Sequence, residues 1–93
     1  MSESERVRLI RERLEEALAP QELAIRDESH LHVGHEGARD GRGHFHVTIR
    51  AEAFRGVNPI ARHRMVFDAM GELMNTDIHA LRIDAAPPSG DDS

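Results

Sequence analysis

The strongest constraint on the fold is a strict alternation of apolar and polar side chains in residues 44–50. Phe45, Val47 and Ile49 take every second position, and two histidines, a threonine and an arginine fill the positions around them. Because successive side chains of a strand point to opposite faces of a sheet, this pattern predicts a strand with one buried face and one polar face. The buried face has to be covered by other elements of the chain.

An N-terminal stretch has the periodicity of a helix, with one apolar face made of Val7, Ile10, Leu14, Ala17 and Leu18. Ser2 and Glu5 stand at the spacing of a capping box, which predicts the start of this helix, and Pro20 predicts its end. Arginine and glutamate side chains mix on the opposite face. We therefore expect this helix to be scaffold and not a basic binding surface.

A second long helix is predicted to begin at Asn58, a favoured N-cap, with Pro59 in its first turn. Residues 75–77 are expected to close it. Its apolar face consists of Val66, Phe67, Met70, Leu73 and Met74. Extending that face one turn back places His63 at its edge, where a partly buried structural histidine is the expected role.

Two further strands and a short turn complete the predicted elements. Residues 23–27 alternate in the manner of a short strand, and residues 52–54 are expected to form a single helical turn. Residues 78–83 predict a final strand, in which either Ala80 or Leu81 continues the apolar side.

The resulting order is helix, strand, strand, short helix, helix, strand, which is an α+β arrangement. The economical solution is a three-stranded sheet covered on one face by the two long helices. A crossover from the second strand through the helices to the third makes that pair parallel and the sheet mixed. A chain of 93 residues forms one domain, expected over residues 1–86, and the polar, acidic residues 87–93 are expected to be disordered.

Histidines gather in one segment of the chain. The stretch from Glu28 to His46 holds five of the seven, of which His30, His32 and His35 lie in the long, glycine-rich connection between the first two strands. Each of these three can be a metal ligand or a plain solvated side chain, and a connection of this length is usually functional or disordered. His44 and His46 fall on the polar side of the second strand, where a solvated sheet surface is the simpler expectation.

A further histidine, His79, follows the second long helix and opens the last strand. It can cap the helix C-terminus, or it can meet an imidazole of the connection between the first two strands. In the second case the surface gains two neutral nitrogen ligands, which is half a metal site. The chain has no cysteine, so the remaining ligands, and any thiolates among them, have to come from a second molecule.

Composition and missing motifs exclude several classes of function. The net charge of −5 and the three aromatic residues disfavour nucleic-acid binding, and the absence of cysteine excludes disulfides and a thiol nucleophile. The Gly34–Gly37 GxxG pattern connects strands, whereas a KH-type clamp needs it between helices. Ser29 lacks the context of a nucleophile elbow, and there is no P-loop. We therefore do not expect an enzyme.

No apolar run approaches the roughly 20 residues needed to span a bilayer. The polar N-terminal sequence MSESERVR does not have the form of a signal peptide. We therefore expect a cytoplasmic protein that does not enter membranes, and a monomer or a weak homodimer when free.

Five short motifs, in this order, resemble the BolA family: residues 27–32 (DESHLH), 44–47 (HFHV), 54–56 (FRG), 62–66 (RHRMV) and 78–81 (IHAL). The resemblance covers about Arg6 to Ile83. It implies a class II KH-like fold of αββααβ order. It also implies a non-enzymatic adaptor in iron–sulphur cluster trafficking, whose partner is a monothiol glutaredoxin.

The same resemblance implies a set of ligands. In this family a histidine of the HAL motif and a histidine or cysteine of the loop between the first two strands serve a 2Fe–2S cluster shared with the glutaredoxin. The HAL position is His79 here, and the loop position best matches His32, with His35 as its rival and His30 less well placed. The partner and its glutathione supply the thiolates that this chain lacks.

Two alternative functions remain open. Some members of the family are linked to transcriptional control, so the chain could be a KH-like DNA-binding regulator of morphology or stress response, with Arg62, His63 and Arg64 at the nucleic acid. The acidic net charge and the missing GxxG weigh against this alternative. The other alternative is a KH-like interaction module without a metal.

Overall fold

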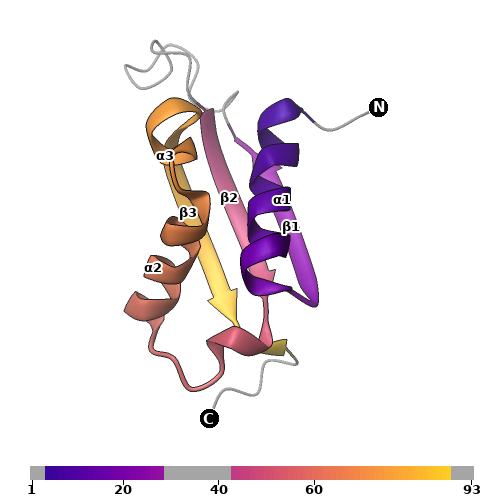
Figure 1. Ribbon diagram of the computed structural model, residues 1–93, viewed down its shortest axis with the longest axis vertical. Helices are drawn as coiled ribbons and strands as arrows, with labels where there is room; N and C mark the ends of the chain where they lie inside the picture. Colours follow the sequence, from indigo (N-terminus) through magenta and orange to yellow (C-terminus); the bar gives the residue numbers. More distant parts are fainter. Residues whose placement is uncertain (1–3, 29–42, 89–93) are drawn as a thin grey trace.

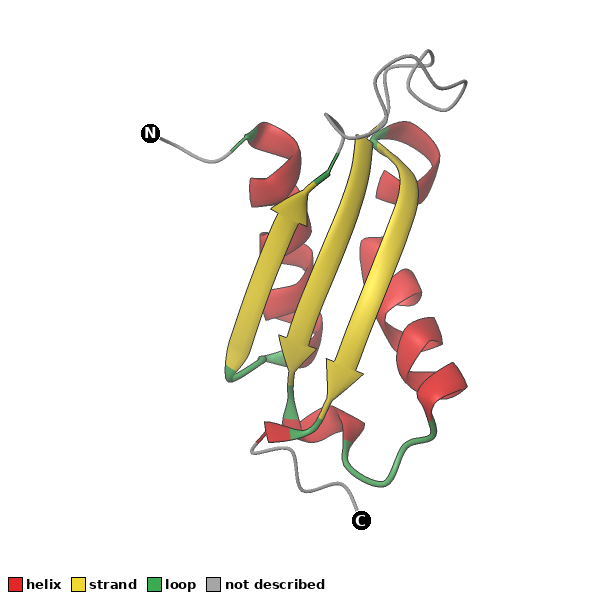
Figure 2. Ribbon diagram, turned by 180° about the vertical axis from the view of Figure 1, so that it is seen from behind, coloured by secondary structure: helices red, strands yellow, loops and turns green. Residues whose placement is uncertain are grey.

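The computed structural model describes residues 4–28 and 43–88. In chain order the elements are α1 (Glu5–Leu18), β1 (Glu22–Asp27), β2 (Gly43–Arg50), the 3-10 turn η3 (Glu52–Phe54), α2 (Pro59–Met70), α3 (Leu73–Thr76) and β3 (Ile78–Ala86). The strands form one sheet in the order β1-β2-β3, with β1 antiparallel and β3 parallel to β2. The helices lie on one face of this sheet, as a comparison of its two sides makes clear (Figure 1, Figure 2). The predicted α+β fold with a mixed sheet is confirmed.

The central strand β2 supplies the middle of the core. Its burial alternates along its whole length, and the side chains of Phe45, Val47 and Ile49 are at most 1% exposed. Helix α1 adds Ile10 and Leu14 to the same core. The one-sided burial predicted from the alternating sequence is therefore present, and the polar side of β2 faces away from the helices.

Helix α1 starts and ends at positions that differ slightly from the sequence prediction. Its N-cap is Ser4, whose Oγ accepts a hydrogen bond from the backbone N–H of Val7 at 3.2 Å. The predicted cap, Ser2, lies outside the described residues. The helix ends at Leu18 because Ala19 takes a left-handed conformation with φ of 47°, one residue before Pro20.

The second helical segment is divided into two. Asn58 caps α2 as predicted, its Oδ1 accepting from the N–H of Ala61 at 2.9 Å. The prediction of one helix as far as residues 75–77 is wrong, because Gly71 takes a φ of 56° and stops α2 at Met70, after which α3 forms a single turn. Phe67 was also misassigned to the core: it is 37% exposed. The residues that α2 buries are Arg62, Val66 and Met70, spaced four apart.

Replacing Gly71 with alanine is expected to lower the free energy of unfolding by about 1–3 kcal/mol, because a side chain at this positive φ is strained. A Cβ at this position would also lie 3.1 Å from Nη1 of Arg13. The matched control is Gly56→Ala, where φ is 76° and no heavy atom lies within 4 Å of the new Cβ. This variant therefore has the backbone strain of a positive φ without a close contact. Urea unfolding of both variants measures the difference. A Gly71→Ala variant as stable as the wild type would contradict the assigned backbone conformation.

The packed part of the chain extends beyond the predicted boundary at residue 86. Pro87 is fully buried and Pro88 is buried, so both belong to the folded domain. Residues 89–93 lie outside the described part. In the ranges 4–28 and 43–88, none of the helices is both long and apolar enough to cross a membrane.

Candidate metal centre

One end of the sheet gathers the elements that the sequence singled out. Strand β1 ends at Asp27, and β2 and β3 begin at Gly43 and Ile78. Because β1 runs against the other two strands, these three points lie at the same end, which Figure 1 shows beside α3. Both attachment points of the connection between β1 and β2 therefore lie at the end of the sheet where His79 stands.

A β-bulge decides which way His79 faces. Gly43 pairs with Ile78 and His44 with Ala80, so β3 has one extra residue at this point. Counting back from Leu81, which packs against the core, strict alternation would turn His79 inward. The extra residue reverses this: Ile78 is 1% exposed and His79 is exposed. Bulges often redirect a side chain in this way next to functional sites.

The bulge brings His79 next to His44 of β2. The centres of the two rings are 5.1 Å apart, and their planes are inclined by 45°. His44 is half-buried, and its Nε2 atom is buried. The assignment of His44 to the polar side of the sheet is confirmed, but nothing in the order of the residues indicates that it neighbours His79. That signal would have required the parallel register of β2 and β3 and the bulge within it.

Glu28, the last described residue before the connection, is a buried carboxylate that joins all three strands. Its side chain is 7% exposed, and its Oε1 accepts a hydrogen bond from Nη1 of Arg82 on β3 at 3.2 Å. Its other oxygen lies 4.0 Å from Nη1 of Arg26 on β1. The backbone N–H of Glu28 donates to the carbonyl of His44 on β2 at 2.8 Å. Glu28 thus fixes the point where the connection leaves the sheet, directly beside His44.

The other predicted metal ligands, His32, His35 and the less favoured His30, lie outside the described residues. Within residues 4–28 and 43–88, no group of three or more histidine, cysteine, aspartate or glutamate side chains is arranged to hold a metal ion. The described part of the chain therefore offers a pair of imidazoles, and any further ligand has to come from elsewhere.

The residues predicted for nucleic-acid binding have different surroundings. Arg62 is 7% exposed, and its Nε and Nη1 donate to the carbonyls of Val57 and Ala85 at 2.7 and 3.1 Å. It holds the start of α2 against the end of β3 and does not present its guanidinium to a phosphate. His63 and Arg64 are exposed, so the expected partial burial of His63 is wrong.

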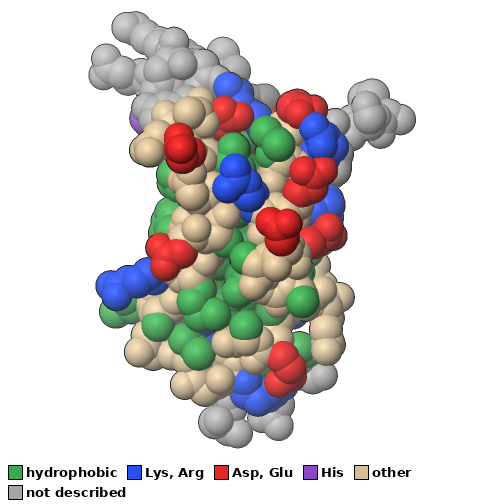
Figure 3. All heavy atoms as spheres, in the orientation of Figure 1, with side chains coloured by type: hydrophobic (Ala, Val, Ile, Leu, Met, Phe, Trp, Pro, Cys, Tyr) green, Lys and Arg blue, Asp and Glu red, His purple; other side chains and the backbone are tan. Residues whose placement is uncertain are grey.

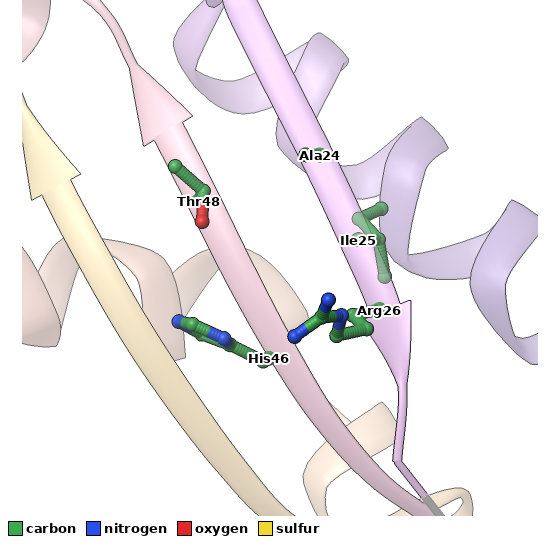
Figure 4. Close-up of a pocket in the computed structure, with 5 residues that line it drawn as sticks. All are labelled: Ala24, Ile25, Arg26, His46 and Thr48. Carbon is green, nitrogen blue, oxygen red and sulfur yellow. The ribbon is translucent and has the colours of Figure 1, made fainter.

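Among the described residues, arginines alternate with carboxylates on the face of the helices, and Arg26 and Arg82 on the opposite face lie near Glu28 (Figure 3). On the face of the helices, arginine side chains are interspersed with aspartates and glutamates (Figure 3). On the opposite face a pocket lies between β1 and β2, lined by Ala24, Ile25, Arg26, His46 and Thr48 (Figure 4). Arg26 and His46 are cross-strand neighbours there, but Arg26 lies within 4.0 Å of the Glu28 carboxylate. On the face of the helices (Figure 3) and around this pocket, the described residues therefore place carboxylates near the arginines, which weakens their attraction to a phosphate backbone.

Comparison with known proteins agrees with this architecture. Residues 14–89 match the family model described as BolA-like protein. The chain is 41% identical over 83 residues to the chloroplastic protein BOLA1 of Arabidopsis thaliana, covering 86% of this chain and 52% of that protein. It is 39% identical over 85 residues to the chloroplastic/mitochondrial SufE-like protein 1 of the same plant, covering 86% of this chain and 23% of the relative. The chain thus spans about half the length of the first relative and about a quarter of the second.

Among solved structures, the BolA domain of SufE1 from Arabidopsis thaliana superposes with a TM-score of 0.82 at 36% sequence identity. The match covers 95% of this chain and 98% of that one. Both the sequence relatives and the fold therefore agree with the resemblance carried by the short motifs. The chain belongs to the BolA family.

Proposed function

We propose that this chain is a non-enzymatic adaptor that binds a 2Fe–2S cluster jointly with a monothiol glutaredoxin. His79 is the ligand that the folded domain contributes. A loop imidazole, His32 with His35 as its rival, is the second ligand. Glutathione and the glutaredoxin supply the thiolates on the other iron.

The observation that supports this proposal best is the bulge that turns His79 outward. An imidazole facing the core could not reach a cluster held by another protein, whereas His79 is exposed at the end of the sheet. Both Glu28 and Gly43, between which His32 and His35 lie in the sequence, stand at that same end. Membership of the family and the occurrence of a related domain in a SufE-like protein are in keeping with an iron–sulphur role.

The donor set fits such a cluster. Imidazole nitrogen replaces thiolate on one iron of Rieske-type 2Fe–2S centres, and it raises the reduction potential of the cluster there. This chain has seven histidines and no cysteine, so it can offer imidazole nitrogens to the cluster but no thiolate. In the complex, the residues of this chain would hold one iron, and Glu28, paired with Arg82, would keep the start of the loop at the end of the sheet.

The test is to add the protein to a monothiol glutaredoxin loaded with a 2Fe–2S cluster and to record visible absorption and circular dichroism. Wild type is expected to change both spectra, His79→Ala to abolish the change, and His32→Ala to reduce it more than His35→Ala. His63→Ala is the matched control, because His63 is exposed on α2 and remote in sequence from both ligand positions. Spectra that stay the same on adding wild type would reject the shared cluster.

A further inference from the structure

We propose that His44 and His79 form a two-imidazole site that binds a single divalent transition-metal ion to the folded chain alone. This site needs neither a partner protein nor the histidines of the connection between β1 and β2. It is distinct from the shared cluster in its metal, its second ligand and its independence of the glutaredoxin, so it does not rest on the proposed function.

The distance between the two rings is suitable for both of them to bind the same metal ion. The ring centres of His44 and His79 are 5.1 Å apart. With metal–nitrogen bonds of about 2.1 Å and a tetrahedral angle between them, two imidazole ring centres on one ion lie about 5 Å apart. The backbone therefore already holds the two rings at the separation that such an ion requires.

Both ligands belong to the ordered sheet, which reduces the entropy lost on binding. His44 stands on the central strand, next to the fully buried Phe45. The residues just before the bulge are held in place as well: the N–H of Gly43 donates to the carbonyl of Asp77 at 2.9 Å, and Ile78 is 1% exposed. The hydrogen bonds and packing of both strands thus hold this pair of imidazoles in place before an ion binds.

The charges around His44 are compatible with a bound cation, whereas those around His46 disfavour one. His46 lies on the same side of β2 as His44, and its neighbours in the register are Arg26 on β1 and Arg82 on β3. The register neighbour of His44 on β3 is the uncharged Ala80. On the β1 side, the neighbour of His44 is Glu28, whose carboxylate accepts a hydrogen bond from Arg82. A divalent ion at His44 and His79 therefore meets less repulsion than one at His46.

Imidazole nitrogen suits zinc, copper and nickel, and these are the ions we expect at this site. Two protein ligands leave further coordination positions on the ion. Water or a ligand from another molecule can occupy them, so the bound ion remains accessible.

The test is calorimetric titration of the metal-free protein with Zn²⁺ and with Ni²⁺, without glutaredoxin. Wild type is expected to bind one ion per chain, and His44→Ala and His79→Ala are each expected to weaken binding at least about tenfold. His46→Ala and His63→Ala are the matched controls and should stay within about twofold of wild type. A triple variant with His30, His32 and His35 replaced by alanine should retain the site.

Wild-type affinity in His44→Ala, or loss of binding in the triple loop variant, would overturn the proposal. Far-ultraviolet circular dichroism and the thermal midpoint of each variant exclude unfolding as the cause, and His44→Gln, which keeps a polar side chain at the strand, provides a second variant. Paramagnetic Ni²⁺ should broaden the NMR signals of the His44 and His79 rings before those of His46 and His63. Simultaneous broadening of all four would likewise count against the site. Since no cluster is present, failure here is distinguishable from failure of the shared-cluster experiment.

Discussion

Replacing Phe45 with alanine is expected to lower the free energy of unfolding by about 3–5 kcal/mol. The ring is 1% exposed on the central strand, where it packs in the core formed with α1 and α2. Removing it takes away apolar burial and leaves a cavity that the sheet cannot close by moving, because β2 is paired on both sides. A domain of this size has about 5–15 kcal/mol of stability in total, so the variant should be close to unfolding at 37 °C.

The matched control is Phe67→Ala on α2, which removes the same side chain from a position that is 37% exposed. Its expected cost is about 1 kcal/mol or less, because little buried area is lost. Urea unfolding followed by circular dichroism measures both variants at constant protein concentration. Equal losses in the two variants would contradict the assignment of Phe45 to the core and of Phe67 to the surface.

Replacing Arg62 with alanine is expected to lower the free energy of unfolding by about 2–4 kcal/mol, the largest loss after that of Phe45→Ala. The residue is 7% exposed, and its guanidinium donates to the carbonyl of Val57, which precedes α2, and to that of Ala85, near the end of β3. Without it, these carbonyls lose their charged donor in a partly buried place, and the side chain leaves a void. Lysine should not restore stability, because its single ammonium group cannot reproduce the two hydrogen bonds that Nε and Nη1 of the planar guanidinium donate to different carbonyls.

The neighbouring Arg64 provides the control, since it is exposed on the same helix. Arg64→Ala should change the free energy of unfolding by less than about 0.5 kcal/mol. The pair of variants also tests the nucleic-acid alternative. A regulator that bound DNA through this helix would lose affinity and part of its salt dependence in Arg64→Ala while remaining fully folded. Tolerance of Arg62→Ala without loss of stability would contradict the structural role of that guanidinium.

The general architecture can be predicted from local patterns, because the two-residue period of the strand and the 3.6-residue period of the helix are both clear in the sequence. The alternation around Phe45 identifies a half-buried strand, and the spacing of Ile10 and Leu14 identifies a helix that covers it. The N-cap at Asn58 and the turn at Glu52–Phe54 could also be predicted, since each depends only on residues within one helical turn. Right-handed crossover geometry then leaves the parallel pairing of β2 and β3 as the simplest connection.

The sequence predictions are wrong at positions where the same local pattern is compatible with two different structures. Apolar residues continue past Gly71, so the sequence alone favours one long helix, whereas the positive φ of this glycine ends it. Val66 and Phe67 are adjacent and both apolar, but about 100° separate them around the helix, and only one can face the core. The choice between Ala80 and Leu81 in the last strand was undecided for a similar reason, because a bulge shifts the alternation there.

The amino-acid sequence by itself determined which face of the sheet is buried and which kinds of ligand this chain can offer, because apolar spacing and the absence of thiols are visible in the residue order. Only the tertiary structure decided that His79 turns outward and meets His44, and that Arg62 is committed to backbone carbonyls. The same holds for the pairing of Glu28 with Arg82, 54 residues farther along the chain. Each of these contacts depends on the register between strands distant in sequence, and a single extra residue in β3 is enough to change it.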